Sequence, residues 1–259
     1  MLTLIRSQDK AALARLAKSR QAQEAQTEKT VRRIIGDVRK NGDTALIRLT
    51  RKFDRVDLRR DGFLVTAEEI RLAYQRVGRD FISAVRQAAR NVRTAARRQL
   101  PRAWTCSTIP GVQVGQVVRP IERAACYVPG GRFPLPSTVL MSVIPAQAAG
   151  VSDIIVTSPK PAPEVLVTAD LIGIQKIFRL GGAQAIAAFA YGTESVPRAD
   201  KIVGPGNRFV AAAKKLVAGD CGIDFVAGPT ELVVVGSKGQ SAWIAADLVA
   251  QAEHDPDAS

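Results

Sequence analysis

The chain has 259 residues, 46% of them hydrophobic, and its 37 Lys and Arg against 24 Asp and Glu give a formal net charge of +13. This composition is typical of a globular protein and excludes disordered, collagen-like and small disulfide-stabilised proteins. Residues 1–100 hold 24 basic and 11 acidic side chains and therefore carry the whole net charge.

The cysteines and the apolar runs indicate where the protein resides. Cys106, Cys126 and Cys221 lie far apart and form no C-x-x-C pair, so the sequence encodes neither a disulfide framework nor a cysteine zinc site. No run approaches the roughly 18 apolar residues of a membrane span, and charged residues stand within the first ten positions, where a signal peptide is apolar. We expect a soluble, cytoplasmic protein without membrane contact.

The first hundred residues predict an amphipathic helical layer. Apolar residues recur there at helical spacing, with arginines between them, over 31–38 and 81–95. Thr66 and Glu69 have the spacing of a capping box, which predicts a helix from this point to about Val77.

From residue 111 onwards, short β-branched runs alternate with alanine-rich stretches, and Gly or Pro separates them. The predicted strands are 112–118, 124–128, 153–157, 176–180, 201–203 and 231–235. The predicted helices are 137–149, 164–171, 183–191, 208–218 and 242–254. This alternation is typical of an α/β fold with a mostly parallel, doubly wound sheet and helices on both faces.

Three glycine turns follow predicted strands, at 129–131, 181–182 and 204–207. The carboxyl ends of parallel strands expose backbone amides that favour anionic groups such as a dinucleotide pyrophosphate. Alternatively, the glycines only shape the turns and Asn207 only caps the following helix. The dinucleotide fingerprint G-x-G-x-x-G is incomplete, since Phe209 replaces the third glycine, and the phosphate-binding G-x-x-x-x-G-K-[ST] is absent.

His254 is the only histidine, and Gln251 precedes it by three residues, on the same face of the last predicted helix. Two ligands cannot hold a zinc ion, so a metal site here requires further ligands from sequence not present. The other interpretation is a favourably placed charge at a helix end. Because an α/β domain rarely ends directly after such a helix, we expect the chain to be part of a longer polypeptide.

Seven sequence blocks together carry a resemblance to a known family. The chain resembles histidinol dehydrogenase over essentially its whole length. The blocks are CYVPGG (126–131), PSTVLMSVIP (136–145), GGAQAIA (181–187), GTESVP (192–197), KIVGPGNRF (201–209), ID followed by AGPTE (223–231) and QAEH (251–254).

The resemblance implies an oxidation of L-histidinol through histidinaldehyde to L-histidine, with two NAD molecules used in succession and a bound zinc ion. It also implies an intertwined homodimer with incomplete Rossmann-like domains. Residues 1–124 would form the helical N-terminal region and the start of the first α/β domain. Residues 125–232 would form the domain that carries much of the NAD site, and residues 233–259 would return to the first domain.

The resemblance assigns roles residue by residue. Tyr127, Gln184 and Asn207 would contact NAD. Thr230, Gln251 and His254 would contact histidinol, and Gln251 and His254 would also be two of the zinc ligands.

Two positions depart from the family pattern: Thr230 replaces a common Ser and keeps its hydroxyl, whereas Asp255 replaces a common Gly and adds a carboxylate beside the metal. The family's Glu-His pair for acid-base catalysis and its remaining zinc ligands, an Asp and a His, lie beyond residue 259. The chain by itself is therefore expected to be inactive. Two alternatives remain: a noncatalytic NAD-binding α/β module, and a basic nucleic-acid-binding protein whose N-terminal arginines neutralise phosphates.

Overall fold

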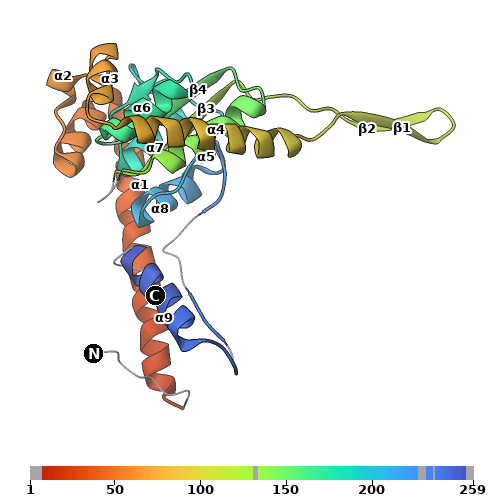
Figure 1. Cartoon of the computed structure of the whole chain (residues 1–259). Coiled ribbons are helices and arrows are strands. Elements are labelled where there is room, and N and C mark those ends of the chain that lie inside the picture. The colour runs from red at the N-terminus through yellow and green to blue at the C-terminus, as the bar shows by residue number, and fades with distance from the viewer. Residues whose placement is uncertain (1–7, 131–133, 227–231, 236, 255–259) are drawn as a thin grey trace.

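The computed structural model describes residues 8–130, 134–226, 232–235 and 237–254, except the side chains of residues 13, 15–23 and 254. A five-stranded parallel sheet forms the centre of this part of the chain (Figure 1). Its strand order is β5-β4-β3-β6-β7. The strands are β3 (Arg123–Tyr127), β4 (Asp153–Thr157), β5 (Ile177–Phe178), β6 (Lys201–Val203) and β7 (Gly222–Ile223). The predicted α/β fold with a parallel sheet is confirmed.

Helices connect the strands as predicted. They are α5 (Pro136–Ala148), α6 (Pro163–Leu171), α7 (Gly182–Tyr191) and α8 (Arg208–Val217), followed by α9 (Ser241–His254). Both α5 and α6 begin one residue earlier than predicted, at a proline. Proline suits a first helical position because its φ is already helical and no intrahelical acceptor is available there for an N–H.

The two faces of the sheet are covered by different helices, as the side-chain alternation of β3 shows. Ala125 and Tyr127 belong to one buried cluster, with α1, α7 and α8, whereas Cys126 and Val128 belong to a second, with α3 to α6. Successive side chains of a strand point to opposite faces, so both faces of this strand are buried. This explains why the strands are almost continuously apolar.

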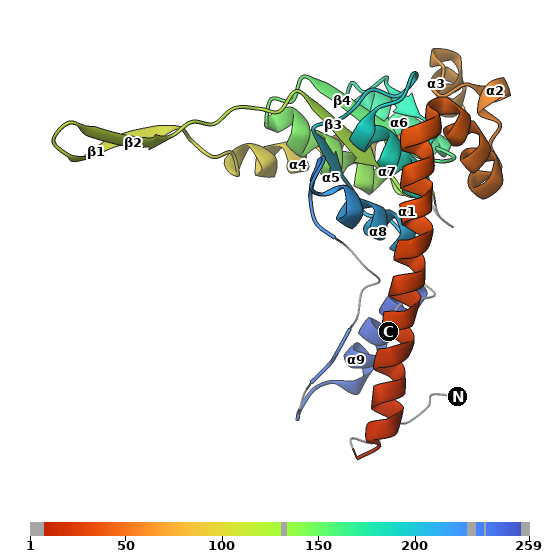
Figure 2. The ribbon, with the colours of Figure 1, turned by 180° about the vertical axis from the view of Figure 1, so that it is seen from behind.

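The N-terminal region is helical, as expected. It consists of α1 (Lys10–Asp54), α2 (Leu58–Asp61), α3 (Ala67–Tyr74) and α4 (Arg79–Arg98). The predicted capping box at Thr66 and Glu69 is present, and the helix it begins ends at Tyr74. The apolar positions at 31–38 are buried against the sheet layer. The N-terminal half of α1 projects away from the sheet (Figures 1 and 2).

Helix α1 has a kink at Gly42, whose φ is +47°. A Cβ at this glycine would lie 2.4 Å from Glu194 Oε2. The next residue, Asp43, accepts hydrogen bonds from the Thr193 hydroxyl, at 2.6 Å, and from the Ser195 hydroxyl. The GTESVP block therefore has a structural role, because it fixes α1 against the segment after α7.

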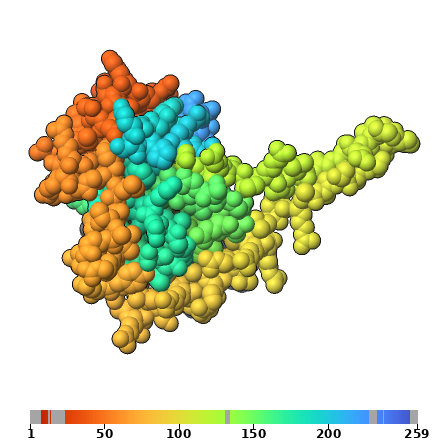
Figure 3. Space-filling view, turned by 90° about the horizontal axis from the view of Figure 1, so that it is seen from above, coloured from red at the N-terminus to blue at the C-terminus, as the bar shows by residue number. Residues whose placement is uncertain are grey.

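Strands β1 (Trp104–Ile109) and β2 (Val112–Gln116) form an antiparallel hairpin that extends far from the rest of the molecule (Figure 3). Every residue of both strands is exposed. The sequence predicted a strand at 112–118 within the alternation of the parallel sheet, and this predicted place in the fold was wrong.

None of the helices in the described ranges combines the length and apolar character that a membrane span requires.

The predicted strand at 231–235 is not formed in the described residues 232–235, whereas Glu231 lies outside the described residues. Val233 is 80% exposed and Val235 is 92% exposed. The alternating apolar pattern predicts strand character, but a strand also needs a neighbour with which to pair its backbone groups. No described segment supplies that neighbour.

Candidate functional site

The candidate site lies at the carboxyl edge of the parallel sheet. The chain leaves β3 for β4 and β5 on one side and later returns to place β6 on the other side of β3. The loops after β3 and β6 therefore diverge to opposite sides, which is the point where doubly wound sheets bind their ligands.

Glycine allows the backbones to approach closely at this edge. Gly204, directly after β6, has a φ of +115°, and a Cβ there would lie 2.1 Å from the carbonyl oxygen of Tyr127. A Cβ at Gly130 or Gly181 would lie 2.6 or 2.5 Å, respectively, from a carbon of the Pro159 ring. The loops after β3, β4, β5 and β6 therefore pass close to one another at positions where only glycine leaves enough space.

Tyr127 and Gln184, both predicted from the resemblance to contact NAD, lie together at this edge. Tyr127 ends β3 and is 3% exposed, and its hydroxyl accepts a hydrogen bond of 3.1 Å from the backbone N–H of Gly182. Burial raises the pKa of Tyr127 to about 12, so the hydroxyl keeps its proton and remains a donor. Gln184 is 1% exposed, in the first turn of α7.

Asp54, the last residue of α1, completes this cluster. Gln184 Nε2 donates a hydrogen bond of 3.0 Å to Asp54 Oδ2. Burial raises the pKa of Asp54 from its ordinary 3.8 to about 6, and the hydrogen bond from Gln184 and the charge of Lys160 only partly oppose this shift. A perturbed carboxylate at a sheet edge is a feature of functional sites.

Asn207 lies at the same edge, after β6, where it caps α8. Its side-chain oxygen accepts hydrogen bonds from the backbone N–H groups of Phe209 and Val210. The structural interpretation of Asn207 as a helix cap is thus confirmed, and its contact with NAD stays a prediction.

A buried ion pair braces the turn that precedes Asn207. Lys214, 1% exposed on α8, bonds to the carboxylate of Asp224 and donates to the carbonyl oxygen of Gly204 at 3.0 Å. Asp224 in turn accepts from the N–H of Gly204 at 2.7 Å. Both backbone groups of Gly204 are therefore satisfied without a ligand.

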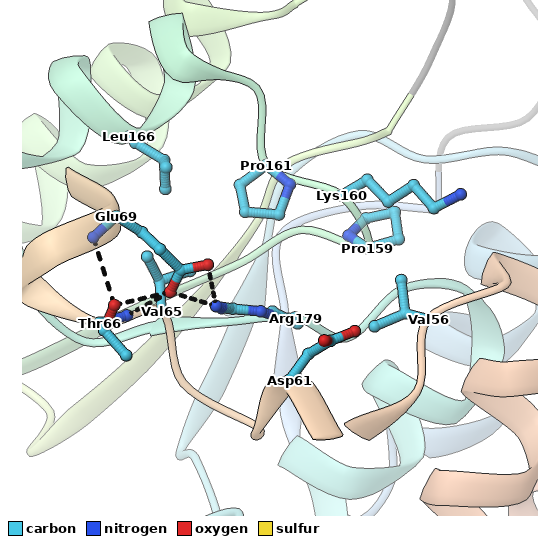
Figure 4. Close-up of a pocket in the computed structure, with 10 residues that line it drawn as sticks. All are labelled: Val56, Asp61, Val65, Thr66, Glu69, Pro159, Lys160, Pro161, Leu166 and Arg179. Carbon is cyan, nitrogen blue, oxygen red and sulfur yellow. Dashed lines mark hydrogen bonds and ion pairs between the residues drawn. The ribbon is translucent and has the colours of Figure 1, made fainter. Parts of the chain in front are cut away.

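A pocket of about 470 Å³ continues this edge beyond β4 and β5 (Figure 4). Pro159, Lys160 and Pro161 line one side, and Arg179 lies opposite, with its guanidinium paired with Glu69. Burial would raise the pKa of Glu69, but hydrogen bonds from Thr66 and Arg179 hold it below its ordinary value. Arg179 Nη1 is buried and has no partner among the described residues.

The predicted substrate and zinc residues are only partly described. Gln251 is half-buried on α9, and His254 is the last residue of that helix, but its side chain lies outside the described part. Thr230 and Asp255 also lie outside the described residues. The described ranges contain no group of three His, Cys, Asp or Glu side chains placed to hold a metal ion. The zinc site therefore stays a prediction.

Asp54 was not among the residues that the sequence singled out. It is the last residue of an amphipathic helix and precedes Gln184 by 130 residues, so no local spacing connects the two side chains. Its position in a helical C-terminus, where an acid is unfavourable to the helix dipole, was the one available signal.

Comparisons with known proteins agree on one family. A sequence model of the histidinol dehydrogenase family matches residues 17–259. The histidinol dehydrogenase of Geobacter sulfurreducens is 48% identical over 240 residues, which is 90% of this chain and 56% of that protein. That of Methanothermobacter thermautotrophicus is 49% identical over 233 residues, or 87% of this chain and 54% of that protein.

A crystal structure of histidinol dehydrogenase from Elizabethkingia anophelis is similar in fold. It superposes with a TM-score of 0.80 at 40% sequence identity and covers 89% of this chain and 54% of that chain. The chain thus spans about half the length of the relatives it matches.

Proposed function

The chain belongs to the histidinol dehydrogenase family, and we propose that a protein with the family's whole length and this sequence oxidises L-histidinol through histidinaldehyde to L-histidine. This is the closing reaction of histidine biosynthesis. It removes four electrons from the substrate alcohol, two for each NAD, and water supplies the second carboxylate oxygen.

The observation that carries the cofactor proposal is the grouping of Tyr127, Gln184 and Asn207 at the carboxyl edge of β3, β4, β5 and β6. These residues fit a dinucleotide because the edge combines close backbone approach at Gly204 with a protonated phenol and a buried amide. NAD would supply the hydride acceptor, and the residues of the chain would bind and orient it.

The proposed substrate residues are Thr230, Gln251 and His254, with Gln251 and His254 as two of the zinc ligands. Since a zinc ion needs three or four ligands, the remaining Asp and His would come from the part of the family's length that this chain does not cover. We also propose the homodimer, the domain boundaries given above and a cytoplasmic location, which the free Cys106, Cys126 and Cys221 support.

An NADH assay on a protein of the family's whole length that contains this sequence tests the function. With L-histidinol, NAD and zinc, we expect absorbance at about 340 nm to rise by two NADH per histidine formed. NAD binding without any turnover of histidinol would favour the noncatalytic module instead.

A variant tests the proposed metal ligand in the same protein. His254→Ala is expected to lose bound zinc and activity together, whereas Glu253→Gln, a neighbour that is exposed on α9, is expected to keep both. Zinc content is measured by atomic absorption after dialysis. Full zinc occupancy in His254→Ala would show that the assigned ligand is wrong.

A further inference from the structure

Asp54 is a titratable group in the candidate site to which neither the family motifs nor the sequence analysis gives a role. It lies at the end of α1, and its carboxylate reaches across to the first turn of α7 to accept from Gln184 Nε2 at 3.0 Å. The Asp54 side chain is mostly removed from water, and this environment disfavours its charge. A carboxylate kept in such a place requires an explanation.

The geometry shows what the carboxylate does to the amide. With Nε2 of Gln184 turned to Asp54, its Oε1 lies nearest to Gly182: a Cβ on that glycine would be 2.8 Å from Oε1 and 3.4 Å from Nε2. The oxygen and the nitrogen of a side-chain amide are similar in size, but the oxygen accepts hydrogen bonds and the nitrogen donates them. A partner that can only accept therefore binds the nitrogen and turns the oxygen to the other side. An ionised carboxylate is such a partner.

The sheet edge adds a second reason to assign a role to this carboxylate. Dinucleotide sites of doubly wound folds place an acidic side chain at the end of the second strand of the unit. That strand here is β4, and the residues after it are Ser158, Pro159 and Lys160, none of them acidic. Lys160, in that loop, acts electrostatically on Asp54, an acid at the end of α1.

We propose that Asp54 is a positioning residue of the dinucleotide site, whose ionised carboxylate holds the Gln184 amide with Oε1 turned towards the Gly181–Gly182 turn, the orientation in which it meets the cofactor. This role rests on the proposed NAD site. Protonation of Asp54 adds an O–H donor beside the remaining acceptor oxygen, so the carboxyl no longer fixes the orientation of the amide. NAD affinity therefore falls as the pH drops from 7 to 5.

Among the described residues, the ionisable groups with an electrostatic interaction with Asp54 are Lys160, on the loop after β4, and Tyr127, on β3. The variant Asp54→Asn imitates the protonated acid, because its amide nitrogen can donate to Gln184 Oε1. A comparison of this variant with the wild type therefore separates Asp54 from every other group that titrates in the same range.

Isothermal titration calorimetry with NAD on the purified protein at pH 5, 6 and 7 tests the role. We expect Asp54→Asn and Asp54→Ala to raise the Kd at pH 7 about three- to tenfold and to abolish its pH dependence. The matched control is Asp57→Asn, an acid three residues away that caps α2 and accepts from the Arg59 N–H. Because Asn caps equally well, this variant keeps the wild-type Kd and pH profile.

A double-mutant cycle shows whether Asp54 acts through Gln184. If it does, Asp54→Ala in a Gln184→Ala background produces no further loss of NAD affinity. Additive losses, or an unchanged Kd in Asp54→Ala while Gln184→Ala weakens binding, would overturn the role of Asp54 and leave the NAD site standing. Absence of NAD binding by the wild type would overturn both.

Discussion

At the scale of single residues, Asp54 links a cost in stability to a role in binding. Its folded-state pKa of about 6 lies above its ordinary 3.8. As the pH falls, the folded protein therefore binds this proton at a higher pH than the unfolded chain does. The contribution of Asp54 to stability is most favourable below pH 4 and is lost as the pH rises through 6. At pH 7 the ionised side chain opposes folding.

Asp54→Asn is therefore expected to stabilise the folded protein at pH 7, by roughly 2 to 4 °C in Tm, while it weakens NAD binding. The gain is expected to disappear near pH 4, where the wild-type carboxyl is protonated in the folded state. Thermal unfolding followed by circular dichroism at both pH values measures this. A lower Tm at pH 7 would mean that the charge of Lys160 compensates fully for burial.

Gly204 occupies a backbone position in the candidate site where any other residue type is unfavourable. Its φ of +115° disfavours every L side chain, and the added methyl group would overlap the carbonyl of Tyr127. Gly204→Ala is expected to cost about 3 kcal/mol or more in free energy of unfolding.

The control for this change is Gly219→Ala, because a Cβ there meets nothing within 4 Å and is expected to shift stability by no more than about 0.5 kcal/mol. Urea titrations of both variants give the two values. Equal effects would contradict the close packing between β3 and β6.

At the scale of elements, α1 is the helix on which the site depends. It delivers Asp54 to Gln184, and it is fixed eleven residues earlier by Asp43, which accepts from Thr193 and Ser195. Burial would raise the pKa of Asp43, but the hydrogen bond from the Ser195 hydroxyl and those of its neighbours hold it below the ordinary value. Asp43 therefore stabilises the fold above about pH 4, and this contribution is lost on acidification.

Asp43→Ala is expected to lower the free energy of unfolding by about 1 to 2 kcal/mol at pH 7, because three donors of the segment after α7 lose their acceptor. Asp37→Ala, on the same helix, removes an acid whose partners Asn41 and Arg48 also belong to α1. It is expected to cost no more than about 0.5 kcal/mol. Similar losses in chemical denaturation would show that Asp43 does not dock the helix.

Sequence patterns predicted the elements whose signals are local. The strands at 124–128, 153–157 and 201–203 and the capping box at Thr66 depend on residues close together in the chain, and they were confirmed. The strand β1 was missed because Thr105, Cys106 and Ser107 interrupt its apolar character. The strand predicted at 231–235 is not formed over the described residues 232–235, because a pattern does not reveal whether a partner strand lies beside it.

The site was predictable only in part. The motif resemblance assigned Tyr127, Gln184 and Asn207 to one site. They lie at one sheet edge because the turns after parallel strands share that edge. It missed Asp54, because the contact of a helix end with a side chain 130 residues later depends on how the helix packs and on no spacing in the sequence.

At the scale of the whole molecule, many of the described basic residues of the N-terminal hundred lie exposed on helices, and several of them are paired. Arg32 pairs with Glu28, Arg48 with Asp37 and Arg71 with Glu68. Such pairs favour an ordinary helix surface over a phosphate-binding face. Retention of residues 1–100 on DNA or RNA that salt abolishes would support the nucleic-acid alternative instead.

The 259-residue chain purified alone with zinc, NAD and L-histidinol is expected to form no NADH, because the resemblance places the family's acid-base pair outside it. The longer protein in the same assay is the control. Steady turnover by the short chain would show that its own residues supply proton transfer.

The exposed hairpin determines which structural changes the intrinsic tryptophan fluorescence of the protein can detect. The chain has two tryptophans: Trp104, 52% exposed at the start of β1, and Trp243, 69% exposed on α9. Neither belongs to the buried clusters on the two faces of the parallel sheet. Both indoles are already hydrated in the folded state, so tryptophan fluorescence will change little when the sheet unfolds, whereas it will respond to anything that covers the hairpin or α9.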